Sequence, residues 1–129
     1  MWVFTTPAIA HHIYGLSLED TSSQQYQDAG DWVGILFGVY NLVSAIVALF
    51  FLPYIAKKIG RKATHSLSLV IGGIGLISIY FMPDENWVVL PMILIGIAWA
   101  SILAMPYAIL AGSITPKKMG VYMGIFNFF

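Results

Sequence analysis

One short basic segment, Lys57-Lys58-Ile59-Gly60-Arg61-Lys62, decides how this chain is interpreted. It contains four of the six Lys and Arg residues in 129 residues. An uncharged apolar run precedes it at residues 32–56, and another follows it at residues 66–82. Membrane proteins retain lysine and arginine on the cytoplasmic side. A basic turn between two apolar runs of this length therefore predicts a cytoplasmic hairpin between two transmembrane helices.

The composition also indicates a membrane protein. The chain is 59% hydrophobic and only 9% charged, whereas soluble domains carry about 25% charged residues. This charge is too little to cover a water-facing surface, so the lipid bilayer is the expected surrounding. The net charge of zero provides no field that would attract nucleic acid, and we expect no such partner. The absence of cysteine from the sequence excludes disulfides and thiolate metal sites.

Apolar runs and turn residues divide the chain into three complete spans and two partial helices. A helix needs about 20 residues to cross the hydrocarbon core, and the first and last helical segments are shorter. We therefore expect a fragment of a longer protein, cut inside one membrane helix at each end. Asp31 is the expected N-cap of the first complete span. The predicted order within this single transmembrane domain is partial helix 1–13, outside loop 14–31, span 32–56, inside turn 57–63, span 64–82, outside turn 83–86, span 87–112, inside turn 113–118 and partial helix 119–129.

The distribution of charge agrees with this order. All six basic residues fall in the two turns predicted to lie inside, 57–63 and 113–118. All six acidic residues fall in the segments predicted to lie outside, 14–31 and 83–86. The sequence therefore predicts an all-α integral membrane protein whose loops 57–63 and 113–118 are cytoplasmic.

Small residues in the spans predict close helix packing. Helices in lipid associate through small residues that let their backbones approach. Gly34 and Gly38 are four apart in the first span, and Gly72 lies in a glycine-rich part of the second. In the third span a small residue recurs every fourth position from Gly96 to Gly112. We expect these positions to mark helix interfaces.

Polar and aromatic residues at membrane depth are the candidates for function. Asn41 and Ser44 lie three apart in the first span. They form either an interhelical hydrogen bond or the polar wall of a solute pathway, because a buried amide is costly unless it is paired or faces water. Trp99 and Tyr107 lie on the face of Pro106, which we expect to kink the third span. They either line a cavity or contribute to ordinary aromatic packing.

Acid–base catalysis and metal binding have no support in the sequence. No complete span carries Asp, Glu, Lys, Arg or His near its middle, so we expect no enzyme. The histidines have no carboxylate partners at helical spacing, so we expect neither a metal site nor a cofactor. His11 and His12 lie at an outer helix end, where they anchor the interface or relay a proton.

The basic turn resembles the cytoplasmic signature of the major facilitator superfamily, Gly-x-Leu-x-Asp-Arg-x-Gly-Arg-Lys. Lys58, Gly60, Arg61 and Lys62 match this signature. The chain departs from the signature at residues 53 and 57, where proline and lysine replace the glycine and the acid. This departure fits the weaker repeat of the signature between helices eight and nine of that family.

Further segments resemble one branch of this family, the proton-coupled sugar symporters of the sucrose and glycoside type. They are residues 5–7, 32–41, 105–110 and 118–129. The resemblance implies the end of helix seven, helices eight to ten and the start of helix eleven, in a bacterial inner membrane. It implies a sugar substrate, a proton as coupling ion and a missing N-terminal half of the same chain. By position and chemistry, the cavity residues it implies are Tyr40, Asn41, Trp99, Tyr107 and Asn127.

Two functional hypotheses follow from these observations. The first is sugar transport by alternating access, in which two helical bundles rock around a central site. The second is a small polytopic membrane subunit or scaffold without a solute pathway. Transport predicts that Asn41, Trp99 and Tyr107 converge on one side of the fold. The scaffold hypothesis predicts that they point to separate interfaces and that the Gly96–Gly112 ridge contacts a partner.

Overall fold

The computed structural model describes residues 2–128, which form helices and connecting turns without a strand. Residues 1 and 129, the outermost positions of the two expected partial helices, lie outside the described part. The α-helices are α1 (Thr5–His12), α2 (Gln24–Ile46), α3 (Leu52–Ile59), α4 (Arg61–Ile79), α5 (Val89–Ser113) and α6 (Met119–Phe128). Shorter elements are the 3-10 helices η1 (Trp2–Phe4), η3 (Glu85–Val88) and η4 (Pro116–Lys118), and the π-helix η2 (Val47–Phe51).

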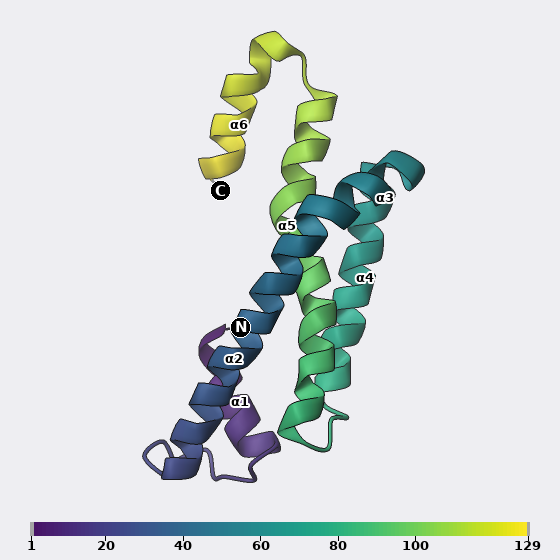
Figure 1. The fold of residues 1–129 in the computed structure, drawn as a ribbon. Coiled ribbons are helices and arrows are strands. Elements are labelled where there is room, and N and C mark those ends of the chain that lie inside the picture. Colours follow the sequence, from purple (N-terminus) through teal and green to yellow (C-terminus); the bar gives the residue numbers. More distant parts are fainter. Residues whose placement is uncertain (1, 129) are drawn as a thin grey trace.

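Three helical stretches are long and apolar enough to cross a membrane. They are Gln24–Ile59, Arg61–Ile79 and Glu85–Ser113. Helix α5 packs against α4 and α2, and α1 packs against α2. Figure 1 shows α4 and α5 running side by side while the α2–α3 stretch crosses them, and α6 turning back beside the upper half of α5. The expected all-α membrane fold with three spans is confirmed.

The first span begins earlier than its apolar residues indicate. Its first helix, α2, starts at Gln24, because the Ser23 side chain accepts a hydrogen bond from the Tyr26 amide at 3.2 Å. Asp31 therefore lies inside α2, and its expected role as N-cap is wrong. The outside loop expected at 14–31 is correspondingly shorter, since residues 24–31, nearly half of it, are helical.

A π-helical segment lies where this span passes Pro53. Proline cannot donate a backbone hydrogen bond, and its ring clashes with the preceding turn of a regular helix. The wider turn of η2, just before Pro53, accommodates this interruption without ending the span. The whole stretch has 36 residues, or about 54 Å at 1.5 Å per residue. It therefore extends beyond a hydrocarbon core of about 30 Å.

The basic turn is a single residue. Helix α3 ends at Ile59 and α4 begins at Arg61, so most of the turn expected at 57–63 is helical. Gly60 links the two helices with φ 86° and ψ 156°, a backbone conformation that is essentially confined to glycine. The charged side chains of the segment consequently lie on two helix ends that meet at one sharp corner.

Small residues bring α5 into close contact with its neighbours. A methyl group added at Gly72 would meet the Ala98 side chain, and one added at Gly96 would lie 2.8 Å from the Tyr40 carbonyl oxygen. These contacts confirm close packing at two of the expected positions. Gly34 and Gly38 differ, because a methyl group at either would meet no atom of the described chain within 4 Å. The expectation that this pair packs against another element is not met among residues 2–128.

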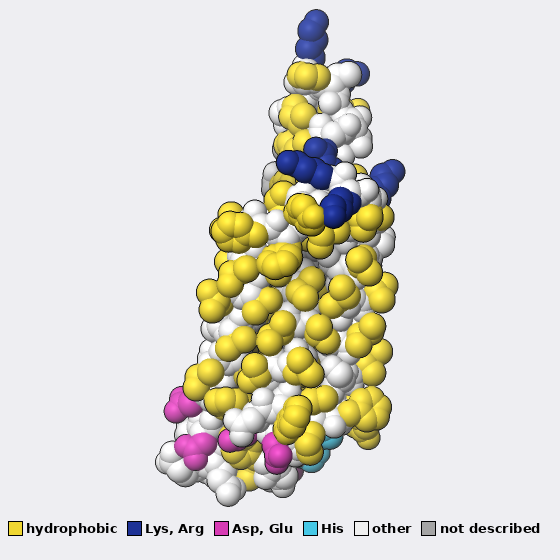
Figure 2. Space-filling view, turned by 45° about the vertical axis from the view of Figure 1, so that its right-hand side comes forward, with side chains coloured by type: hydrophobic (Ala, Val, Ile, Leu, Met, Phe, Trp, Pro, Cys, Tyr) yellow, Lys and Arg dark blue, Asp and Glu magenta, His cyan; other side chains and the backbone are white. Residues whose placement is uncertain are grey.

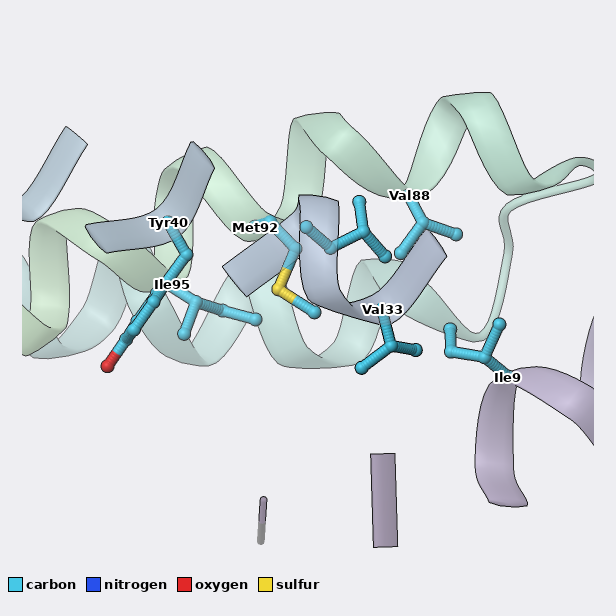
Figure 3. Packing of buried hydrophobic residues seen from close by; sticks show 7 residues of the cluster. Ile9, Val33, Tyr40, Val88, Met92 and Ile95 are labelled. Carbon is cyan, nitrogen blue, oxygen red and sulfur yellow. The ribbon is translucent and has the colours of Figure 1, made fainter. Parts of the chain in front are cut away.

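A buried apolar cluster holds together the end of the bundle where α1, the start of α2 and the start of α5 meet. Figure 3 shows side chains from α1, α2, η3 and α5 meeting at this point. The cluster consists of Ile9, Val33, Leu36, Tyr40, Val88, Met92 and Ile95. It brings α1 and the start of α5 onto the same part of α2, and Tyr40 forms its edge toward the middle of the span.

Charge separates to the two ends of the molecule. Figure 2 shows Lys and Arg side chains beyond one edge of a broad hydrophobic band, and Asp and Glu side chains beyond the other. Large apolar side chains on α4 are exposed within the band, for example Val70 and Ile77. This pattern belongs to a protein whose surrounding is lipid, and it agrees with the alternation of loops expected from the sequence.

Candidate functional site

Three of the five candidate residues line one hollow between α2 and α5. Tyr40, Asn41 and Trp99, together with Phe37, line an open space of about 350 Å³. The rings of Tyr40 and Trp99 are 6.1 Å apart between centroids, and those of Phe37 and Tyr40 are 6.3 Å apart. We call this space the aromatic hollow. Phe37 was missed by sequence reasoning, although its place one helical turn before Asn41 could have revealed it.

The Asn41 amide bonds within its own helix. Its Nδ2 donates to the Phe37 carbonyl oxygen at 2.7 Å, and its side chain is exposed. Ser44, which was expected on the same face, is instead buried. Of the two alternatives for Asn41, an interhelical hydrogen bond does not occur within the described residues. The exposed amide keeps an oxygen that can accept a hydrogen bond.

Contact between α2 and α5 positions the aromatic hollow. Tyr40 is buried, and its backbone lies against Gly96, where no larger residue would fit without moving the helices. This close approach places Trp99, one turn further along α5, beside the Tyr40 ring. The geometry of the hollow therefore depends on a helix crossing rather than on a flexible loop.

Tyr107 and Asn127 form a separate pair. The Tyr107 hydroxyl donates to Oδ1 of Asn127 at 2.6 Å, and Asn127 Nδ2 donates to the Met123 carbonyl oxygen at 2.8 Å. The Tyr107 ring also packs edge-on against Phe126, with centroids 5.0 Å apart. The structure thus divides the five candidates into a group on α2 and α5 and a pair linking α5 to α6.

The small-residue ridge of α5 is used inside the chain. Gly96 contacts α2, and Ala100 and Ala104 pack in a cluster with Leu52. A methyl group added at Gly112 would meet the Arg61 guanidinium. Most of the ridge therefore packs against neighbouring helices of this chain, and Gly112 at its end is exposed. Little remains of the partner surface that the scaffold hypothesis required.

The arginine of the basic turn connects α4 to α5. Arg61 Nη1 donates to the Ala108 carbonyl oxygen at 2.6 Å, beside Gly112. The guanidinium lies near the carboxyl end of α5, where the helix dipole is negative. Lys58 lies over the Tyr54 ring, with Nζ 4.5 Å from the centroid, and Lys62 is exposed. Of the four residues that match the signature, Gly60 and Arg61 therefore have structural roles in forming the corner.

A hydrogen-bonded clasp joins two loops at the acidic end. The Tyr14 hydroxyl donates to the Glu85 carboxylate, and Trp32 Nε1 donates to the Glu85 carbonyl oxygen at 2.9 Å. Burial raises the pKa of Tyr14 to about 12, and the hydrogen bond to Glu85 and its negative charge act in the same direction. His12 adds a bond to the Tyr80 carbonyl oxygen at 3.0 Å. We call the Tyr14–Glu85–Trp32 contacts the outer clasp.

The outer clasp predicts a stability change at high pH. The pKa of Tyr14 is raised from 10.0 to about 12 on folding, so its protonated form is favoured in the native state. Its contribution is complete below pH 10 and is lost as the pH rises to about 12. We expect the melting temperature of the wild type to fall more steeply across this window than that of Tyr14→Phe. If the melting temperatures of the two proteins fell equally across this pH range, the clasp would be contradicted.

A polar contact links the start of α4 to the middle of α5. His65 Nδ1 lies 2.9 Å from the Ser101 hydroxyl, and Ser101 is fully buried. His65 is thus held against α5. Within residues 2–128 no group of three or more His, Cys, Asp or Glu side chains could hold a metal ion.

The fold and the charge distribution define a polytopic α-helical integral membrane protein. The sequence matches the family model of the Major Facilitator Superfamily over residues 1–129, and the chain belongs to this family. Members of the family are membrane transporters and not enzymes, and the match assigns this chain to membrane transport in general. No match was found among curated proteins or among solved structures.

Proposed function

We propose that this chain contributes to sugar transport by alternating access, with the aromatic hollow as part of the solute site. The observation that supports this proposal is the meeting of Asn41 with Tyr40 and Trp99 around one open space of about 350 Å³. Solute sites of such transporters lie near the bilayer midplane, between two helical bundles. Asn41 lies well inside the first span, far from both charged ends.

The chemistry of the aromatic hollow suits a sugar. Apolar ring faces pack against the C–H faces of a pyranose, and a few placed polar groups fix its orientation. The exposed Asn41 amide supplies the polar group, since its oxygen can accept from a sugar hydroxyl. Tyr107 and Asn127 form a second polar group further along α5, which would contact the solute after a movement of α6.

Protons are the proposed coupling ion, in symport with the sugar. The complete spans contain no acidic residue near their middle, so the coupling carboxylate would come from another part of the transporter. We further propose that the basic end faces the cytoplasm of a bacterial inner membrane, because lysine and arginine are retained on that side. The N-terminal half of the same chain would then supply the opposing bundle.

Uptake of labelled disaccharide tests this proposal. In intact cells or vesicles with an inward proton gradient, Asn41→Ala should reduce uptake by about tenfold, the effect expected for one lost hydrogen bond. Leu42→Ala is the matched control, because Leu42 is the next residue, is 63% exposed and does not line the hollow. Equal uptake by both variants, at matched protein amounts in the membrane, would exclude Asn41 from the solute site.

A further inference from the structure

A second hollow lies between the first span and α4, with α5 as its floor. Its volume is about 360 Å³, and its walls are almost entirely apolar. We call it the apolar groove. Side chains that define it are Val43 and Ile46 of α2, Leu67 and Ile71 of α4, and Ile93 and Ile97 of α5. Ile46 and Leu67 are exposed at its rim, so the groove is open on one side.

Two hydroxyl residues in the groove offer nothing to a polar solute. The Thr64 hydroxyl donates to the Gly60 carbonyl oxygen at 2.8 Å, and the Ser68 hydroxyl donates to the Thr64 carbonyl oxygen at 2.9 Å. Both side chains are buried and present their carbon atoms to the groove. A sugar would lose its hydration here without compensation, whereas a hydrocarbon chain would not.

The apolar groove and the aromatic hollow lie on opposite faces of the α2–α5 pair. Positions two apart on an α-helix differ by about 200°. On α2, Asn41 lines the hollow and Val43 lines the groove. On α5, Trp99 lines the hollow and Ile97 lines the groove. When the hollow faces a solute pathway, the groove faces away from it, toward lipid.

Positive charge lies at the end of the groove. Ile55 lines the groove from α3, and Lys58 is three residues further along the same helix, which places it on the same face. Lys57 precedes Lys58 on α3, and Arg61 and Lys62 follow the Gly60 corner at the start of α4. All acidic residues of the chain lie in segments 19–31 and 84–85, at the opposite end. Within residues 2–128, no carboxylate is therefore near enough to neutralise this corner.

We propose that the apolar groove binds an acyl chain of an anionic phospholipid whose phosphate lies against Lys58 at the basic corner. The groove supplies the apolar surface, and the corner supplies the charge that selects an anionic headgroup over a zwitterionic one. Lys58 lies over the Tyr54 ring. Tyrosine and lysine are both typical of the membrane interface, so we expect this pair to lie there. This site goes beyond the proposed function and does not depend on which solute is carried.

Native mass spectrometry of the intact purified transporter tests the headgroup selection. The protein is incubated with phosphatidylglycerol or with phosphatidylcholine of the same acyl chains. We expect phosphatidylglycerol to be retained preferentially, and Lys58→Ala to reduce its binding about fivefold, as one interfacial lysine should. Lys117→Ala, which removes the same charge from the other basic turn, should leave binding unchanged. Equal retention of both lipids, or equal loss in both variants, would overturn the proposal.

A probe in the groove tests the position of the acyl chain. The chain has no cysteine, so a fluorophore can be attached to Leu67→Cys at the groove rim and to Ile74→Cys, an exposed position on α4 outside the groove. In vesicles of phosphatidylcholine containing one tenth brominated phosphatidylglycerol, we expect stronger quenching at residue 67 than at residue 74. Adding Lys58→Ala should make the difference in quenching between the two positions smaller. Equal quenching would overturn the proposal. An unquenched probe at residue 67 would also overturn it, because another helix would then fill the groove. Cross-linking of two copies of Leu67→Cys through residue 67 would overturn it as well.

Discussion

Replacing Gly72 by leucine should separate α4 from α5 and lower the free energy of unfolding by about 2 kcal/mol or more. A Cβ at this position would meet the Cβ of Ala98, which is fixed to the α5 backbone and cannot rotate away. Overpacking of this kind costs about 1–3 kcal/mol, and more where a backbone must shift. The better helix propensity of leucine returns only about 1 kcal/mol. Thermal unfolding in detergent, followed by size-exclusion chromatography, measures the change.

Gly73→Leu is the matched control, because it adds the same side chain one residue away. No atom of the described chain lies within 4 Å of a Cβ at Gly73. We expect this variant to be as stable as the wild type or slightly more stable, since leucine favours the helix. If both variants melted together below the wild type, the close packing of α4 on α5 would not exist as described.

Gly60→Ala is expected to have the second-largest effect, a loss of about 1–3 kcal/mol. The backbone at Gly60 has φ 86° and ψ 156°, a region that residues with a Cβ occupy only under strain. Relief of this strain would open the corner and move Arg61 away from the Ala108 carbonyl oxygen. The melting temperature should fall, and transport should fall with it.

Gly34→Ala provides the comparison for this substitution. Gly34 is helical and has open space around it, so alanine should leave stability unchanged or raise it by up to about 1 kcal/mol. A Gly60→Ala protein as stable as Gly34→Ala would mean that the corner does not require glycine. It would also mean that the match of Gly60 to the family signature does not reflect a structural role of this residue.

The spans could be predicted from the sequence because lipid imposes a simple pattern on it. Apolar length and the position of Lys and Arg are enough to place three crossings. The start of α2 could not be predicted in this way, because residues 24–31 are polar and extend beyond the hydrocarbon core. Their helix begins at the Ser23 cap. Serine and aspartate are about equally good N-caps, so the sequence alone does not choose between Ser23 and Asp31.

The helix faces were only partly predictable. Composition identifies glycines as packing residues, but it does not say which of Gly72 and Gly73 meets α5. That choice depends on the rotation of α4 about its axis, which the partner helix sets. Gly34 and Gly38 show the same limit, because their spacing suits an interface and the described chain provides none.

The candidate site was predictable in its chemistry and less so in its grouping. Asn41 and Trp99 meet because α2 crosses α5 at Gly96. Tyr107 instead bonds to Asn127, an arrangement set by the return of α6 after η4. The outer clasp joins Tyr14 to Glu85, 71 positions apart, and no local pattern in the sequence relates them.

Thiol labelling at residues 41 and 42 is the most direct test of a solute pathway along the aromatic hollow. The chain has no cysteine of its own, so Asn41→Cys and Leu42→Cys each give one reactive site. In intact membranes, a water-soluble maleimide should label residue 41 and spare residue 42, which lies outside the hollow and is expected to face lipid. A transported sugar should protect residue 41. Labelling of residue 42 to the same extent, or no labelling at residue 41, would contradict a water-filled pathway at this face.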